Sequence, residues 1–564
     1  MARTFERGNS VTSVAAPDRS VPSRRIGGVV DRDTSSFDHG PFAADFDTCS
    51  LDGEAVERAD QWATILRRGR LNDVSGAFAL AWRDADGVFN LARDHIGERS
   101  LFFARAQHVG GQGDTALVFA SDLRGVLASG LVRPVIDHVA VARYLSYGYL
   151  PGRGTLLRGI GKLQPAEVAQ FKNGAVSFSS MWSLPEPPPE QSADDEDQLR
   201  ARLRAELEAA VLRRLPTEGP VGASLSGGID SSLVVALARR FHRGDVHTYS
   251  VSFGSGYRNE LPFSSMVADY CHTRHHIVEL TPDLILRHLD ESIAMLGDPI
   301  GDPLTVPNAL LFRTASEDVD VMLNGEGGDP CFGGPKNLPM LLAELFGDGQ
   351  DAYENSSVRG ARERTYLRAH QKCYDDLPRM LSANVRASIA DQVLECELTP
   401  LFADRRWSQF VATLMAINLS FKGAFHILHK VDAVSAPFGV RPRSPLFDRA
   451  VVELAFRLPS QLKLRGSIEK YLLKEAVRDV LPAAIIDRPK SGMLVPVEAW
   501  FKGPLLPHAR ERLLDGLTQY GLFDRAYLER LLTGRLPGLH PRRGVKIWML
   551  VTLESWLRSV GVGG

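Results

Sequence analysis

The chain has 564 residues, of which 44% are hydrophobic and 24% are charged, a composition typical of a folded protein large enough for more than one core. Its 66 Lys and Arg residues nearly balance 68 Asp and Glu residues, so bulk charge would attract neither nucleic acid nor an anionic membrane. Five scattered cysteines without a CxxC pair indicate neither a disulfide framework nor structural zinc. Because the sequence shows no membrane-length apolar run and no signal-peptide core, we expect a cytoplasmic enzyme.

The N-terminal third of the chain predicts a tail, a layered domain and a linker. Residues 1–22 lack apolar periodicity and predict a disordered tail. Short apolar or β-branched runs begin at Ile26, Phe78, Val88 and Leu117, and they predict strands of an α/β domain over residues 23–183. Residues 184–197 combine prolines with an acidic cluster and predict the linker.

The remaining residues, 198–564, predict a second domain. Apolar residues at helical spacing over 198–215 are followed by a short buried strand at 221–225. Strands and helices then alternate at residues 246–253, 263–270, 276–280, 310–317 and 319–323. This alternation predicts βαβ units and a parallel sheet covered on both faces, followed from residue 338 by a mostly helical part.

The most informative segment is SLSGGIDSS at residues 224–232, where two glycines and several hydroxyls lie between a buried strand and a helix. Glycines let backbone N–H groups approach an anion, and the helix N-terminus adds partial positive charge, so this turn predicts a phosphate-binding loop. It lacks the lysine of a Walker loop and carries Asp230 instead, which indicates Mg²⁺ on the bound phosphates. For the loop taken alone, a turn without function is the alternative.

The loop resembles the pyrophosphate-binding loop of the asparagine synthetase superfamily, and the similarity continues along the chain. NGEGGDPCFGG at residues 324–334 resembles the family's GEGxDExFGG motif. Further similar segments are RNELPFSSMVA at 258–268 with His275 and His276, residues 428–448, KYLLKEA at 470–476, RPKSGMLVP at 488–496 and KIWMLVTLESWL at 546–557. On these segments the chain is identified, over about residues 26–557, as a member of this superfamily that resembles asparagine synthetase B.

The resemblance implies an α/β fold. A degenerate class II glutamine amidotransferase domain, an Ntn-type α+β sandwich, would precede a PP-loop ATP pyrophosphatase-type domain with a parallel sheet and a helical C-terminal part. A substrate carboxylate would attack the α-phosphate of ATP, releasing pyrophosphate and leaving an acyl-adenylate, and an amine would then displace AMP.

The resemblance also implies roles for individual residues. Asp230 and Asp329 would hold Mg²⁺ on the phosphates. As catalytic residues, Lys490 and Lys470 would stabilise phosphate or carboxylate charge, and Glu326 would lie near the reacting acyl group. The implied ATP contacts are Ser224, Ser226, Gly227, Gly228, Asp230, Ser231, Ser232, Val251, Ser252, Phe253, Gly325 and Gly327.

The chain departs from the family pattern in its front domain and its substrate loops. The family's glutaminase nucleophile is an N-terminal cysteine, and its place falls here on Arg24, inside the chain. A guanidinium stays protonated and cannot attack an amide carbonyl, so we predict a scaffold without glutaminase activity, with Cys49 as the alternative nucleophile. Pro330 replaces an acid and Arg441 replaces a glutamate of the family motifs, which predicts a changed substrate pocket.

Without glutamine hydrolysis, the amine must come from the substrate or from free ammonia. This state resembles β-lactam synthetases and lasso-peptide cyclases. We therefore predict an AMP-forming amide ligase that acts on a precursor peptide as a lasso-peptide (macrolactam) cyclase in natural product biosynthesis. A partner protease or leader-binding protein is expected, and nucleic acid and membrane are not. The alternatives are an asparagine synthetase using free ammonia, a β-lactam synthetase-like enzyme, and a nucleotide-binding scaffold without activity.

Overall fold

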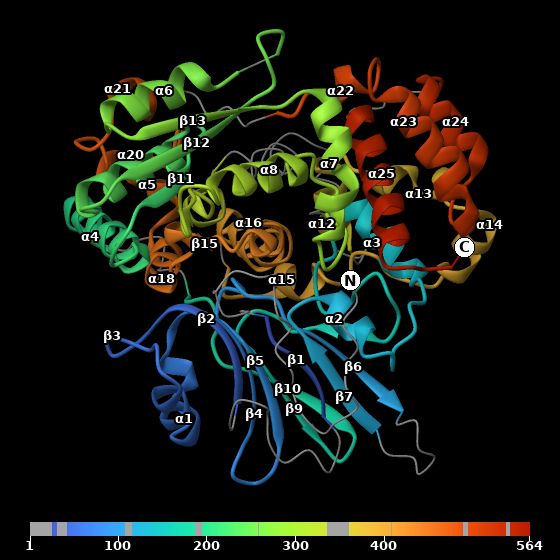
Figure 1. The fold of residues 1–564 in the computed structure, drawn as a ribbon, viewed down its shortest axis with the longest axis horizontal. Coiled ribbons are helices and arrows are strands. Elements are labelled where there is room, and N and C mark those ends of the chain that lie inside the picture. The colour runs from blue at the N-terminus through green and yellow to red at the C-terminus, as the bar shows by residue number, and fades with distance from the viewer. Residues whose placement is uncertain are drawn as a thin grey trace.

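An antiparallel sandwich and a larger domain built on a parallel sheet pack against each other; in Figure 1 the sandwich lies in the lower half and the parallel sheet at upper left. The computed structural model describes residues 25–30, 42–107, 115–186, 195–257, 259–334, 360–407, 409–488, 494–536 and 542–563. The predicted tail, residues 1–22, lies outside the described residues. The predicted order, a sandwich followed by a parallel-sheet domain, is confirmed.

The front domain consists of two antiparallel sheets whose facing side chains form a common core. Their strand orders are β1-β7-β6-β8 and β10-β9-β5-β4-β2-β3. Between the sheets Phe89 packs on Phe119 with ring centroids 5.5 Å apart, and Leu91 and Phe171 belong to the same buried cluster. The elements are β1 Gly27–Val30, β2 Phe42–Leu51, β3 Glu54–Ala55, α1 Ala59–Arg67, β4 Ser75–Arg83, β5 Phe89–Arg93, β6 Phe102–Gln107, β7 Thr115–Ala120, α2 Leu123–Ala128, α3 His138–Tyr147, β8 Ile160–Lys162, β9 Glu167–Lys172 and β10 Ala175–Ser180.

The second domain is built on a parallel sheet with the strand order β13-β12-β11-β14-β15. The strands are β11 Val221–Ser224, β12 Val246–Ser252, β13 Arg274–Glu279, β14 Val321–Leu323 and β15 Arg441–Arg443. The strand order reverses between β11 and β14, and ligands of open α/β sheets bind beyond the carboxyl ends of the strands at such a point. The sheet therefore places its ligand site at the ends of β11 and β14.

Helices cover both faces of this sheet. Alternate residues of β14 point to opposite sides, so Val321 and Leu323 join one buried cluster with α4 and α5, while Met322 joins the other with α7 and α8. The helices that pack on the sheet are α4 Glu196–Arg214, α5 Ile229–Phe241, α6 Leu261–Tyr270, α7 Pro282–Ala294, α8 Thr305–Ala315 and α9 Gly328–Phe332.

The C-terminal part is mostly helical, as predicted. Its elements are α12 Ala361–Ala369, α13 Leu377–Met380, α14 Ala383–Ser388, α15 Thr399–Ala403, α16 Phe410–Ile417, the π-helix η4 Asn418–Ile427, α17 Leu428–Ser435, α18 Arg449–Arg457, α19 Ser460–Lys463, β16 Leu464–Arg465, β17 Ile468–Glu469, α20 Tyr471–Ala476, α21 Ala483–Ile486, α22 Val497–Trp500, α23 Leu506–Glu511, α24 Arg525–Thr533 and α25 Arg543–Ser559. The helical run Phe410–Phe438 is long and apolar enough to cross a membrane, but 78% of its most apolar window is buried inside the protein, as in a core helix.

Buried ion pairs join the two domains. Arg443 of β15 donates to both carboxylate oxygens of Asp47 on β2, with N···O distances of 2.8 and 2.9 Å. Arg214 of α4 contacts Glu98 of the front domain at 3.0 Å and also pairs with Asp448. Burial alone would raise the pKa of Asp47, but Arg443 holds it below its ordinary value. Ion pairs buried from solvent therefore join the sandwich to the parallel-sheet domain.

Candidate active site

Two glycine loops meet at the carboxyl edge of the parallel sheet. The first follows β11 and leads into α5, and the second follows β14 and leads into α9. A methyl group added to Gly325 would lie 2.4 Å from the backbone nitrogen of Ser231, and one added to Gly328 would lie 2.1 Å from a carboxylate oxygen of Asp230. The loops that the sequence places about a hundred residues apart are therefore in direct contact, and their glycines are required by this contact.

Hydrogen bonds from its own serine hydroxyl groups fix the conformation of the first loop. Gly227 adopts φ +71°, the left-handed region that favours glycine, and a side chain there would collide with the backbone of Ser264. The Ser231 hydroxyl accepts a hydrogen bond from the Ser226 amide at 3.1 Å and donates to the Gly228 carbonyl at 3.2 Å. The turn thus presents backbone amides and hydroxyls next to the α5 N-terminus, an arrangement that suits phosphate oxygens.

A buried lysine bridges the two predicted metal ligands. Lys470 Nζ lies 2.5 Å from Asp230 Oδ2 and 2.6 Å from Asp329 Oδ1, and its side chain is 2% exposed. The backbone of Lys470 has φ 54°, which directs the chain into α20 immediately after the β16–β17 hairpin. Two converging carboxylates are a donor set that fits Mg²⁺ bound to phosphates, and the ammonium group balances their charge. Lys470 contacts the aspartates and does not line the large cavity.

Most of the predicted ATP contacts line one cavity of about 500 Å³. Its walls include Ser224, Ser226, Gly228, Asp230, Ser231, Val251, Gly325, Glu326, Gly327 and Asp329. Four predicted contacts do not line it: Gly227, Ser232, Ser252 and Phe253. Ser232 points into the protein at 0% exposure, and Phe253 packs against Trp500 with ring centroids 5.8 Å apart. These two side chains serve packing, because they lie on the side of their elements that faces the core.

Lys490 lies outside the described residues, but residues on either side of residues 489–493 belong to the same site. Arg488 donates to the Gly227 carbonyl at 3.0 Å and forms an ion pair with Glu260 at 2.9 Å. Leu494 lines the cavity. The role of Lys490 stays a prediction.

The far wall of the cavity is lined by basic residues, which the sequence did not lead us to expect. Lys422, His426 and Lys430 follow one another at intervals of four residues along η4 and α17 and all line the cavity. Lys430 and His426 contact Asp302 at 2.6 and 2.9 Å. Burial would raise the pKa of Asp302, yet Lys430 and His426 hold it well below its ordinary value. Lys372, another wall residue, forms no ion pair with an acidic side chain in the part of the chain that the structure describes.

Pro330, Arg441 and Cys49, which the sequence singled out, lie in three separate places. Pro330 lines the cavity beside Asp329. Arg441 does not line the cavity; it points to the domain interface, 3.9 Å from Asp47. Cys49 is 4% exposed, and burial first and then nearby Asp47 raise the pKa of its thiol well above the ordinary value. A changed pocket therefore rests on Pro330, and Cys49 is not a competent nucleophile in this structure.

Comparisons with known proteins agree with this architecture. Residues 202–558 match the asparagine synthase family, and residues 63–182 match the glutamine amidotransferase domain. A putative glutamine-hydrolyzing asparagine synthetase of Mycobacterium bovis is 29% identical, over 93% of this chain and 82% of that protein. Glutamine-hydrolyzing asparagine synthetase 1 of Bacillus subtilis is 24% identical, over 85% and 77%.

Among solved structures, the NH3-dependent NAD synthetase from Campylobacter jejuni superposes with a TM-score of 0.19 and 15% identity, over 32% of this chain and 95% of that chain. So low a score adds nothing to the assignment. The asparagine synthase match, however, covers well over half of the chain and contains both loops that meet at the sheet edge. This chain belongs to the asparagine synthase family.

Proposed function

We propose that this carbon–nitrogen ligase activates a substrate carboxylate with ATP and joins it to an amine of the same substrate, as a lasso-peptide (macrolactam) cyclase that hydrolyses no glutamine. The front domain supplies the main support. At the start of β1, Arg25 is paired with Asp122 at 2.9 Å, and the Ile26 amide donates to the Ser121 hydroxyl at 2.9 Å. Arg24 precedes them in the sequence, so this strand offers neither a thiol nor a terminal amine.

The proposed reaction has two steps, both beside the two loops. A carboxylate oxygen of the substrate would attack the α-phosphorus, the bond to the bridging oxygen would break, and pyrophosphate would leave. The amine nitrogen would then attack the acyl carbon, AMP would leave, and one proton would be lost from the amine. Glu326 is half-buried and lines the cavity beside both loops, where its carboxylate would accept that proton.

The phosphates would lie against the amides and hydroxyls of the first loop. Asp230 and Asp329 would hold Mg²⁺, which supplies charge neutralisation of the triphosphate. Lys470 would remain next to both carboxylates and limit their net charge. The backbone turn at Gly227 and the α5 N-terminus would stabilise the leaving pyrophosphate without any change in structure.

The substrate half of the cavity supports a ligand larger than ammonia and aspartate. The whole cavity of about 500 Å³ must also hold ATP, so this support comes from the lining of the cavity and not from its volume. The Tyr147 hydroxyl in its wall is buried and finds no hydrogen-bond partner among the described residues, so a polar group of a substrate would satisfy it. Lys372 and Lys422 would attract a carboxylate-bearing peptide. A precursor peptide fits these features, and a protease or leader-binding protein would deliver it in the cytoplasm.

The test is a product assay on the purified full chain with ATP, Mg²⁺ and candidate linear precursor peptides. The expected product is the peptide minus one water, with one AMP and one pyrophosphate formed per turnover, and no glutamate from added glutamine. Cys49→Ser should leave all of these unchanged because the thiol is buried. Asparagine formed from aspartate and ammonium at a comparable rate, or glutamate released from glutamine, would overturn the proposal.

A further inference from the structure

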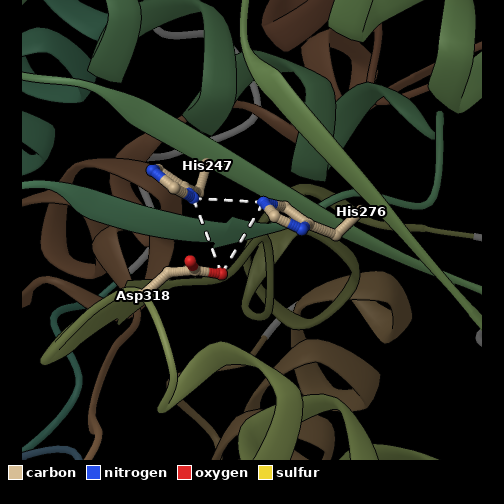
Figure 2. A group of neighbouring side chains, drawn as sticks. All are labelled: His247, His276 and Asp318. Carbon is tan, nitrogen blue, oxygen red and sulfur yellow. Dashed lines mark hydrogen bonds and ion pairs between the residues drawn. The ribbon is translucent and has the colours of Figure 1, made fainter.

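A second cluster of ligand-type side chains lies outside the lining of the cavity, near the amino end of the parallel sheet. Figure 2 shows His247 of β12, His276 of β13 and Asp318, which follows α8, pointing toward one another. His247 Nδ1 lies 3.1 Å from His276 Nε2, and Asp318 Oδ2 lies 3.8 and 3.7 Å from these two nitrogens. His247 is the second residue of its strand and Asp318 precedes β14, whereas the phosphate loops follow the carboxyl ends of the strands.

We propose that these three residues bind a divalent transition-metal ion of the Zn²⁺ type. Zinc in proteins is tetrahedral with bonds of about 2.0–2.1 Å to nitrogen and oxygen, so its ligand atoms lie about 3.3–3.4 Å apart. The three distances in the cluster differ from that value by only a few tenths of an ångström. Two imidazoles and a carboxylate are a donor set that suits Zn²⁺ and leaves the fourth position for water. Cysteine is not needed, which is why the cysteine pattern gave no sign of this site.

The surrounding structure holds the three groups in position. In the strand register His276 lies opposite Tyr249, and their rings stack at 4.8 Å with an interplanar angle of 14°. The two imidazole rings are almost parallel, with centroids 5.2 Å apart. The Tyr249 hydroxyl donates to Asp318 Oδ2 at 3.1 Å, the kind of outer hydrogen bond that orients a metal-binding carboxylate.

The site is also partly open to solvent. The His247 side chain is 7% exposed, while those of His276 and Asp318 are each 33% exposed, so an ion can enter from solvent and then lose most of its water. A bound ion would link β12, β13 and the turn before β14. Its expected effect is on the stability of the sheet and not on the reaction at the opposite edge.

The test uses untagged full-length protein, freed of metal by a chelator and kept in excess Mg²⁺ so that the carboxylates of the active site are occupied. Zn²⁺ is titrated against a chromogenic chelator, and Co²⁺ is used to report the geometry by its visible absorption. We expect one high-affinity Zn²⁺ per chain, a tetrahedral Co²⁺ spectrum and a higher melting temperature with metal. His276→Gln and Asp318→Asn should weaken Zn²⁺ binding by about 10- to 100-fold or more and remove the thermal shift.

His275→Gln is the matched control. His275 is the neighbouring residue of β13, and its ring contacts Thr248 at 2.9 Å instead of the cluster. It should bind Zn²⁺ as the unchanged protein does. Equal stoichiometry and affinity in the unchanged protein, His276→Gln and Asp318→Asn would overturn the site, as would an octahedral Co²⁺ spectrum. Because Asp318 is partly exposed, Asp318→Asn keeps the test valid if His276→Gln fails to fold.

Discussion

Replacement of Lys470 by methionine tests the charge balance at the heart of the site. Methionine keeps the length of the side chain and removes the ammonium group, which leaves Asp230 and Asp329 facing each other. Their side chains are 14% and 8% exposed, so water can compensate little. Removal of one partner from a buried ion pair costs about 3–5 kcal/mol of folding free energy. We expect a loss of this size in EDTA, and a clearly smaller loss in saturating Mg²⁺, because the cation would take over part of the neutralisation.

The assay is urea and thermal unfolding of the Lys470→Met protein, with and without Mg²⁺. Lys463→Met is the matched control, because Lys463 is also 2% exposed but forms no ion pair with a carboxylate among the described residues. Burial lowers the pKa of Lys463 from 10.5 to about 7, so the unfolded chain binds more protons between these values and stability rises with pH there. Lys463→Met should lose that rise without destabilising the protein at pH 7.

A loss below about 1 kcal/mol for Lys470→Met, the size typical of exposed pairs, or an equal loss with and without Mg²⁺, would refute the reasoning.

Three further outcomes follow from the same structure. Asp329→Asn should reduce ATP–pyrophosphate exchange by about 100- to 1000-fold in protein that circular dichroism shows to be folded, and exchange at the original rate would contradict its metal role. Gly328→Ala should also abolish exchange, because the added methyl would lie 2.1 Å from a carboxylate oxygen of Asp230; exchange within twofold of normal would show that the loop relaxes. Arg443→Met should lower stability by about 3–5 kcal/mol, since it leaves Asp47 buried without its main partner, and calorimetry that shows no shift would contradict this.

The sequence predicted the part of the fold in which local pattern and burial agree. The strand expected at residues 221–225 is β11, Val221–Ser224, and the strand expected at 246–253 is β12, Val246–Ser252. Both segments are buried on two faces and lie between turns. Strand β15 was missed because Arg441–Arg443 reads as a charged, proline-containing segment. It pairs with β14, which lies 120 positions away, and contacts Asp47, which lies 396 positions away, and no local pattern contains such partners.

The part of the candidate site that sequence motifs predicted is the part formed by the backbone of the two glycine loops. The two glycine loops meet as their motifs suggested, since each requires residues without a side chain. The bridging position of Lys470 and the outward position of Arg441 depend on long-range packing and were not predictable. The wall of basic residues had a visible signal, because Lys422, His426 and Lys430 recur every four residues, the spacing of one helix face. Their meaning becomes clear only when η4 is found beside the cavity.

The charges buried between the domains also affect whether the second domain can be produced without the first. A protein shortened to start at the linker would lack Asp47 and Glu98. Arg443 and Arg214 would then lose these partners, and the surface that the front domain covers would be exposed to water. Such a product would be expected to aggregate in a heterologous host. If the front domain hydrolyses no glutamine, as proposed above, its cover over these charges still gives a reason for the chain to keep it.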